Sequence, residues 1–198
     1  MNRKAKTFPG AAPIYLESDF YVKADTLRDQ FEAQILGAAD QNGGITSFSH
    51  AFCRDAFQFL TASAQSIFSA DILDDVIGKL GSWATETLGT TSMSTPQTRL
   101  YIQGCSRGLL QDGIGEKWHY MLSICRNRKS SAGHIKLLAP DSSKDGIQRS
   151  VRVGRITNIR LDFNQLLVHS TGASYSIESP KNSMNPLDGV VFLDGYMW

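Results

Sequence analysis

The sequence has little cysteine, no long apolar run and almost no net charge. Its three cysteines form no Cys-x-x-Cys pair, which disfavours a cysteine zinc site or a redox dithiol. We expect reduced, mostly buried thiols, as in a cytoplasmic protein. The longest apolar runs span about five residues, far short of the roughly 20 that cross a bilayer. The first residues also lack the apolar segment of a secretory signal.

The net charge is +1, so no overall field would attract nucleic acid or an anionic membrane, and neither is an expected partner. Apolar residues make up 41% and charged residues 20% of the chain, as in a folded globular protein. A length of 198 residues suffices for one domain with a substantial core, and residues 1–198 are predicted to form a single domain.

Apolar side chains recur at helical spacing in the first part of the chain. Helices are therefore predicted to support the fold between about residues 14 and 90. The segments with this spacing are 24–40, 49–70 and 70–89. In the first of them, Leu27, Phe31 and Ile35 lie on one stripe, and Asp25 is the predicted N-cap.

The pattern changes after Pro96, where short apolar or alternating stretches are bounded by Gly, Pro, Asn or Ser. They are TRLYIQG, WHYMLSIC, HIKLLA, RSVRVG, NQLLVHS, SYSIES and GVVFLDGYMW. About seven short strands in roughly 100 residues predict a sandwich or barrel over residues 96–198. Helices followed by a block of strands indicate an α+β fold.

Several motifs in this second half follow one another in a set order. They are LQD at 110–112, WHYMLSI at 118–124, AGHIKLL at 132–138, FNQLLVH at 163–169, SYSIE at 174–178 and MNPLDGVVFLDGYMW at 184–198. In order and spacing they resemble the double-stranded β-helix of the iron(II)/2-oxoglutarate-dependent oxygenases, in their prolyl-hydroxylase-like branch. The resemblance implies that N-terminal helices pack on a C-terminal jelly-roll, cupin-like barrel.

That family holds iron with a His-x-Asp turn and a second His, and it clamps 2-oxoglutarate with an Arg. By the resemblance, the two His positions fall on Leu110 and Tyr175, the carboxylate on Asp112 and the Arg on Val190. Leucine offers no lone pair, and a phenol with a pKa of about 10 is a poor iron(II) ligand. We therefore expect neither a metal nor 2-oxoglutarate as cofactor. The alternative is a working Fe(II)/2-oxoglutarate-dependent hydroxylase with atypical ligands.

Three histidines lie in predicted barrel strands, at His119, His134 and His169. Each is expected to be an ordinary strand residue, and a rearranged metal site with Asp112 is the alternative. The substrate-binding residues predicted around the altered site are Leu110, Trp118, Tyr120, His134, His169, Val190 and Phe192.

Asp112 and Tyr175 are the predicted catalytic residues, because a carboxylate beside a phenol can move protons. The other interpretation of this pair is a structural hydrogen bond. The predicted function is a metal-independent, redox-neutral cyclisation, isomerisation or elimination of a small molecule in secondary metabolism, in a pocket at the barrel mouth. The alternative of another class is a non-catalytic pseudoenzyme that binds a ligand or partner. The sequence leaves both a monomer and a homodimer open.

Overall fold

The structure is a computed structural model, and it describes most of the chain. The described residues are 4–6, 14–42, 47–53, 56–105, 110–111, 118–126, 134–138, 156–171, 173–181 and 184–198. Asp112, the predicted stretch RSVRVG and the side chain of Leu110 lie outside this part of the chain.

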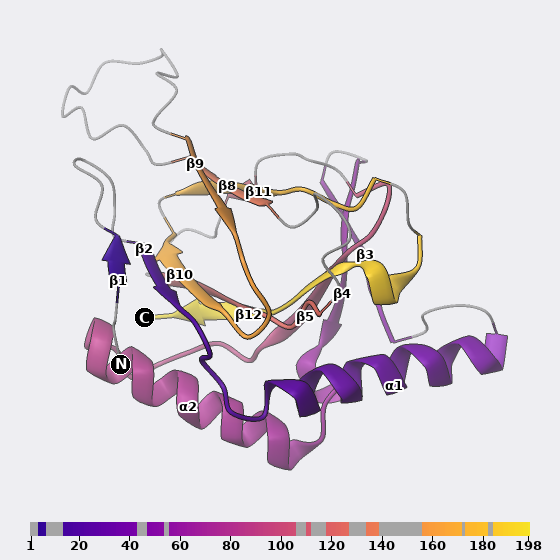
Figure 1. Cartoon of the computed structure of the whole chain (residues 1–198), viewed down its shortest axis with the longest axis horizontal. Helices are drawn as coiled ribbons and strands as arrows, with labels where there is room; N and C mark the ends of the chain where they lie inside the picture. The colour runs from indigo at the N-terminus through magenta and orange to yellow at the C-terminus, as the bar shows by residue number, and fades with distance from the viewer. Residues whose placement is uncertain are drawn as a thin grey trace.

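Two antiparallel sheets and two helices form three layers (Figure 1). The large sheet has the order β1-β2-β10-β7-β12-β5-β4-β3. In that order its strands are Lys4–Lys6, Ile14–Glu17, Leu166–Ser170, Trp118–Ser123, Val190–Met197, Gln97–Tyr101, Ala56–Ser63 and Ser49–Cys53. The small sheet has the order β6-β11-β8-β9, with strands Leu110–Gln111, Ser174–Ile177, His134–Leu138 and Ile156–Arg160. It lies over the face of the large sheet that is turned away from the helices (Figure 1).

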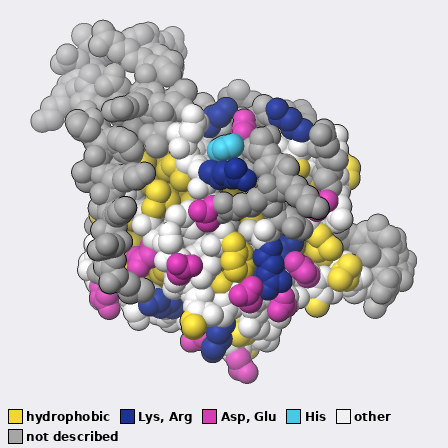
Figure 2. All heavy atoms as spheres, viewed as in Figure 1, with side chains coloured by type: hydrophobic (Ala, Val, Ile, Leu, Met, Phe, Trp, Pro, Cys, Tyr) yellow, Lys and Arg dark blue, Asp and Glu magenta, His cyan; other side chains and the backbone are white. Residues whose placement is uncertain are grey.

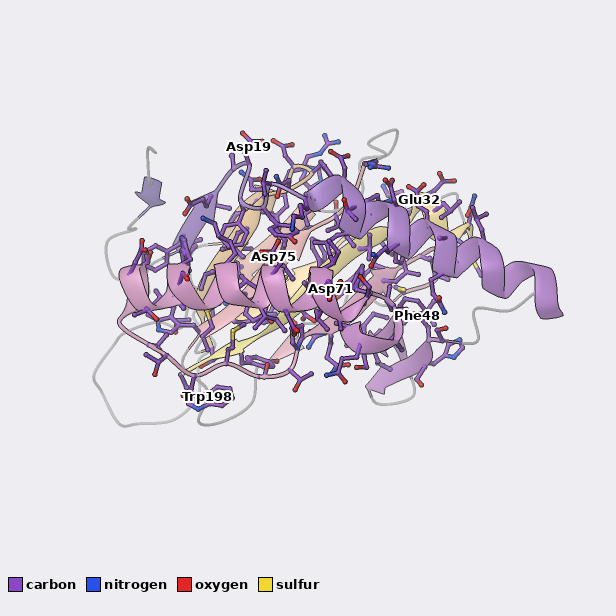
Figure 3. All side chains as sticks on the ribbon, turned by 90° about the horizontal axis from the view of Figure 1, so that it is seen from below. Asp19, Glu32, Phe48, Asp71, Asp75 and Trp198 are labelled. Atoms are coloured by element: carbon purple, nitrogen blue, oxygen red, sulfur yellow. The ribbon has the colours of Figure 1, made fainter. Side chains whose placement is uncertain are left out.

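Helices α1 (Ala24–Asn42) and α2 (Ala70–Leu88) both lie on the other face of the large sheet, as Figure 3 shows from below. The predicted stripe of α1 is confirmed, since Leu27, Phe31 and Ile35 are all buried. Asp25 was expected to cap α1, but it lies in the first turn, where its exposed carboxylate accepts hydrogen bonds from Arg126. The third predicted helix is confirmed as α2.

The expectation of a helix over 49–70 is wrong. These residues form β3, β4 and the short 3-10 helix η1 (Ala64–Ser66). Gln58, Leu60, Ala62 and Ala64 are buried at every second position, which is the period of a strand. Residues 14–17, also expected to lie in the helical part, form β2. The helical support is thus limited to α1 and α2, and the large sheet recruits strands from both halves of the chain.

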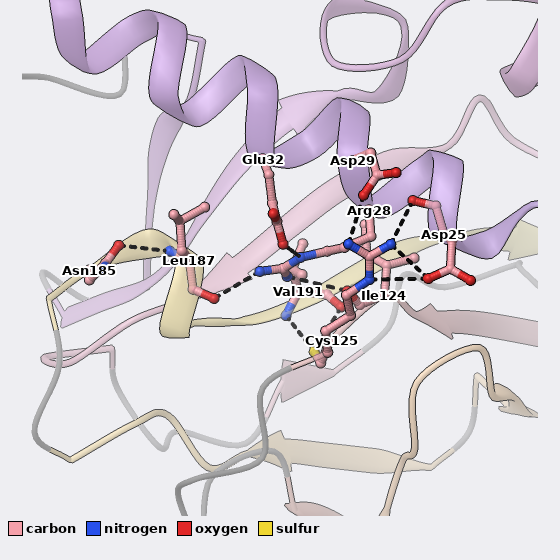
Figure 4. A network of polar contacts seen from close by, with 10 residues as sticks. Asp25, Arg28, Asp29, Glu32, Ile124, Cys125, Asn185, Leu187 and Val191 are labelled. Atoms are coloured by element: carbon pink, nitrogen blue, oxygen red, sulfur yellow. Dashed lines mark hydrogen bonds and ion pairs between the residues drawn. The ribbon is translucent and has the colours of Figure 1, made fainter.

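Arg28 connects α1 to the barrel. Its side chain is 1% exposed, and it donates to the backbone oxygens of Ile124 at 3.2 Å and Leu187 at 2.8 Å (Figure 4). Glu32, one turn along the helix, accepts from Arg28 Nε at 2.6 Å. Leu187 belongs to the 3-10 helix η2 (Pro186–Asp188), which leads into β12. One buried charge thus fixes the helix to the ends of two central strands.

One face of the molecule shows no concentration of charge among its described residues (Figure 2). Acidic and basic side chains are interspersed over the face drawn in Figure 2. None of the described helices is long and apolar enough to cross a membrane.

We expect Arg28→Ala to lower the free energy of unfolding by about 3 kcal/mol, because it leaves buried carbonyls and Glu32 without their donor. Urea denaturation followed by circular dichroism measures the change. Arg126→Ala is the control, since Arg126 also pairs with α1, through Asp25 and Asp29, but at the surface. Its loss should cost less than about 1 kcal/mol. Equal costs for the two variants would contradict the assignment of Arg28 as the anchor.

A buried polar network as candidate active site

Side chains of the large sheet alternate between the helix face and an inner face toward the small sheet. Directly paired residues share a face, and the register pairs His169 with His119, His119 with Tyr196, and Arg99 with Phe192. Four adjacent strands, β10, β7, β12 and β5, therefore bring polar side chains together on the inner face. Tyr175 reaches the same place from β11 of the small sheet.

Two histidines form one end of this network. His169 Nδ1 lies 2.9 Å from the backbone oxygen of Ser170, and His169 Nε2 lies 3.2 Å from His119 Nδ1. The opposite nitrogen of His119, Nε2, lies 3.0 Å from Asp194 Oδ2. Tyr196 stacks on the His119 ring with centroids 4.9 Å apart. Both rings are therefore held in one orientation.

Arg99 forms the other end. Its Nε lies 2.9 Å from Asp194 Oδ2, and its Nη1 donates to the hydroxyl of Tyr175 at 2.7 Å. The guanidinium also lies over the ring of Phe59, 4.8 Å from the centroid. His119, Asp194 and Tyr175 are at most 1% exposed, whereas the Arg99 side chain is 14% exposed. Arg99 is thus the end of the network that reaches toward solvent.

Hydrogen-bond accounting assigns the protons. Burial, and then the neighbouring His119, lower the pKa of His169 to about 3, so His169 is neutral near pH 7. The Ser170 carbonyl can only accept, so the ring proton of His169 is on Nδ1. His169 Nε2 must then accept from His119 Nδ1. Desolvation opposes the charge of Arg99, but Asp194 outweighs it and raises the pKa of the guanidinium well above its usual value. On the other side of the Asp194 carboxylate, His119 Nε2 lies beside the same oxygen, Oδ2.

Arg99 and Asp194 form the charged centre of the network, and the Arg99 guanidinium also donates to the Tyr175 hydroxyl. A buried charge is costly unless something compensates it, and here each member of the ion pair compensates the other. The N–H groups of a guanidinium at this place favour negative charge that develops on a nearby oxygen.

Several buried polar atoms on this inner face have no hydrogen-bond partner among the described residues. They are Asp194 Oδ1 and the hydroxyls of Tyr101 and Ser123. The Tyr101 hydroxyl lies near the Arg99 guanidinium without reaching hydrogen-bond geometry. Because most buried polar groups in folded proteins are paired, these unpaired atoms call for a partner from outside the described residues.

The structure brings some predicted site residues together. Tyr175 and His169 are members of the network, and their rings lie 5.5 Å apart by centroid. Phe192 and Val190 are buried on the same inner face, paired with Arg99 and Tyr101. Leu110 pairs with Tyr175 across β6 and β11, so the two positions matched to the family's histidines are neighbours in the backbone.

Other predicted site residues lie elsewhere. Trp118 contacts Tyr15, which contacts Trp83 of α2, so Trp118 is on the helix face of the large sheet. Tyr120, two residues along β7, shares that face. His134 is partly exposed and pairs with Glu178 at 3.3 Å, apart from the network.

Iron does not fit the described residues. Both nitrogens of His119 and both of His169 are taken up by hydrogen bonds, and the Tyr175 oxygen accepts from Arg99. In the part of the chain that the structure describes, no three His, Cys, Asp or Glu side chains are grouped to hold a metal. A metal site made by His119, His134 and His169 is also incompatible with the separate position of His134.

Sequence reasoning missed Arg99 and Asp194, the two central members. Each is the lone charged residue in an otherwise apolar or neutral strand, QTRLY and VVFLDGYM. A single charge in a central strand needs a buried partner of opposite sign. That signal was present in both strands, but only the sheet order shows that they are neighbours.

Comparisons with known proteins agree on the fold. No protein-family model matches the chain, and no curated protein matches it by sequence. Among solved structures, a Pseudomonas putida prolyl 4-hydroxylase matches with a TM-score of 0.58 and 13% identity over 93% of this chain and 91% of that one. The non-heme α-ketoglutarate-dependent epimerase SnoN from nogalamycin biosynthesis matches with a TM-score of 0.65 and 9% identity, covering 96% and 79%.

The carbocyclase SnoK of the same biosynthesis, also α-ketoglutarate dependent, gives a TM-score of 0.61 at 10% identity, covering 96% and 80%. The resemblance noted in the sequence is therefore confirmed, and the protein has the jelly-roll fold of the iron(II)/2-oxoglutarate-dependent oxygenases. At these identities, the likeness concerns the fold alone.

The low pKa of His169 predicts a pH dependence of stability. The unfolded chain binds a proton at His169 near pH 6.5 and the folded chain only near pH 3, so stability is lost as the pH falls through this window. Near pH 5, protonation of His169 in the unfolded chain should lower the free energy of unfolding by about 1.4 kcal/mol for each unit by which the pH falls. His169→Gln should flatten the slope, because glutamine can still accept from His119 but does not titrate.

Urea denaturation at several pH values between about 4 and 7 measures this slope. His50→Gln is the matched control, since it replaces a histidine that is exposed on β3 rather than buried. Nitrogen chemical shifts of the His169 ring provide a second readout. A His169 signal that titrates near pH 6 in the folded protein would refute the assignment.

Proposed function

We propose that this protein is a metal-independent enzyme that moves protons on a small, enolisable carbonyl compound of secondary metabolism. The network supports this proposal through one contact above all, the 2.7 Å hydrogen bond from Arg99 Nη1 to the Tyr175 hydroxyl. A guanidinium that donates to a phenol oxygen stabilises the phenolate, so Tyr175 can give up its proton. The similar epimerase and carbocyclase act in the biosynthesis of nogalamycin, which supports a substrate of that general kind.

The proposed reaction is redox neutral. Asp112, whose role rests on the sequence alone, takes a proton from the carbon next to the substrate carbonyl. The C–H electron pair becomes a C=C bond, and the carbonyl π pair moves to oxygen. Arg99 N–H groups stabilise this enolate oxygen. Tyr175 delivers a proton to the enolate, and Asp112 returns its own proton to the Tyr175 phenolate through solvent.

Asp194, His119 and His169 have a supporting role in this proposal. Asp194 holds Arg99 through Nε and leaves the other nitrogens for Tyr175 and substrate. His119 and His169 fix the Asp194 carboxylate from the opposite side. Isomerisation, elimination and cyclisation can each begin with the same enolate, so the site does not select among them.

One observation favours a second candidate function, a non-catalytic pseudoenzyme. Tyr175, His119 and Asp194 are almost fully buried, as expected if the network fills the place of a metal. A partner or carried ligand, rather than turnover, would then be the function. Native mass spectrometry of the purified protein, combined with the exchange assay below, separates the two candidates, because only an enzyme exchanges substrate protons.

The proposal predicts catalysed hydrogen exchange without iron. In D2O under argon with EDTA, wild-type protein should introduce deuterium next to the carbonyl of at least one ketone in a panel of enolisable ketones, followed by proton NMR. Tyr175→Phe and Asp112→Asn should each slow exchange at least about 100-fold, the usual value of a positioned acid or base. Tyr120→Phe should leave it unchanged, because Tyr120 is an equally buried tyrosine on the helix face.

Elemental analysis and a 2-oxoglutarate titration complete the test. The proposal expects no stoichiometric iron and no micromolar binding of 2-oxoglutarate after purification with added ferrous salt. Bound iron with consumption of oxygen and 2-oxoglutarate would instead support the atypical hydroxylase. Full exchange by a folded Tyr175→Phe, Asp112→Asn double variant would exclude the assigned pair.

A further inference from the structure

The unpaired atoms around Arg99 define what the site can bind. Asp194 uses Oδ2 for both Arg99 and His119, so Oδ1 is left as a buried acceptor without a donor among the described residues. Arg99 uses Nε and Nη1, and its Nη2 forms no hydrogen bond within the described residues. The ion pair thus offers one acceptor, Asp194 Oδ1, and one donor, Arg99 Nη2, that no described residue engages.

Aromatic rings enclose this ion pair. Phe192, paired directly with Arg99, lies 6.1 Å from the Tyr101 ring by centroid. Phe59 lies 5.5 Å from the other side of Tyr101 and under the guanidinium. A guest at this place therefore contacts ring faces, while its polar atoms face Arg99 and Asp194.

We propose that Arg99 and Asp194 together bind an aromatic ligand that carries a hydroxyl next to a carbonyl. The carbonyl oxygen accepts from Arg99 Nη2, and the hydroxyl donates to Asp194 Oδ1. This inference rests on the proposed function and specifies its substrate class. A carboxylate is a poorer fit, because side-on bidentate pairing needs Arg99 Nε, which Asp194 already occupies. The family's clamping position is also on a different strand, at Val190.

The two protein atoms discriminate between hydroxyl and ether. A hydroxyl satisfies Asp194 Oδ1 by donation, but a methoxy oxygen only accepts and would leave two acceptors face to face. Asp194→Asn reverses this preference locally. Arg99 only donates, so it selects the amide oxygen at the Oδ2 position, and the amide NH2 takes the place of Oδ1 and offers a donor.

The test measures the affinities of α-hydroxyacetophenone, α-methoxyacetophenone and acetophenone by isothermal titration. Wild type should bind the hydroxy ketone at least about 10-fold more tightly than either of the others, as expected for a charge-assisted hydrogen bond. In Asp194→Asn the hydroxy-to-methoxy ratio should fall below about 3. The larger volume of the methoxy group affects binding to both proteins alike, so its effect cancels when the hydroxy-to-methoxy ratio is compared between them.

Thr98→Val is the matched control. Thr98 neighbours Arg99 in β5, is fully buried and also has an unpaired hydroxyl, but it lies on the helix face. Its removal should leave the ratio unchanged. Arg99→Lys is a second variant in case Asp194→Asn fails to fold. It keeps the charge beside Asp194 but lacks Nη2, so affinity for all three ketones should fall at least about fivefold.

An unchanged hydroxy-to-methoxy ratio in folded Asp194→Asn, or no binding of any probe to wild type at millimolar concentration, overturns the inference. If Asp194→Asn does not fold, undiminished binding by Arg99→Lys overturns it. These outcomes are separate from the exchange assay. Tyr175-dependent exchange on other ketones without the hydroxyl preference would leave the proposed function standing while this substrate class fails. Discrimination without any exchange would support the binding site alone.

Discussion

The ion pair between Arg99 and Asp194 determines how the interior of this barrel is arranged. Each side chain alone would be a charge in a central strand, and burying an unpaired charge is among the most costly events in folding. Together they require that β5 and β12 be neighbours, because only then do the two groups meet on the inner face. Tyr175 accepts a hydrogen bond from the Arg99 side of this pair, and His119 contacts its Asp194 side.

The network and a metal centre solve the same structural problem in different ways. A jelly-roll barrel with polar residues on its inner face needs something that engages their lone pairs, and a cation does this in many barrels. Among the described residues a guanidinium provides positive charge, and hydrogen bonds engage the polar side chains around it. Leu110 and Tyr175, the two positions matched to the family's histidines, pair across β6 and β11.

The sequence predicted the strands of the barrel better than the N-terminal part of the chain, which was expected to be helical throughout. Stretches such as WHYMLSIC and GVVFLDGYMW are bounded by turn residues and match β7 and β12 closely, because buried central strands are continuously apolar. Residues 49–63 were mistaken for a helix because Phe52, Ala56, Phe59 and Leu60 are spaced three, four or one apart, which fits either period. The segment forms two strands because β3 pairs with β4 and β4 pairs with β5, which comes about 35 residues later in the chain.

The site was predicted in part for the same reason. Tyr175 and His169 could be identified because their positions follow from motif order along the chain, whereas Arg99 and Asp194 acquire meaning only from the sheet order. The asymmetric use of Asp194, with two donors on Oδ2 and none on Oδ1 among the described residues, is a property of three-dimensional geometry alone. The carboxylate is required to compensate the charge of Arg99. Its second oxygen has no hydrogen to offer, so a donor from outside the described residues would complete the network.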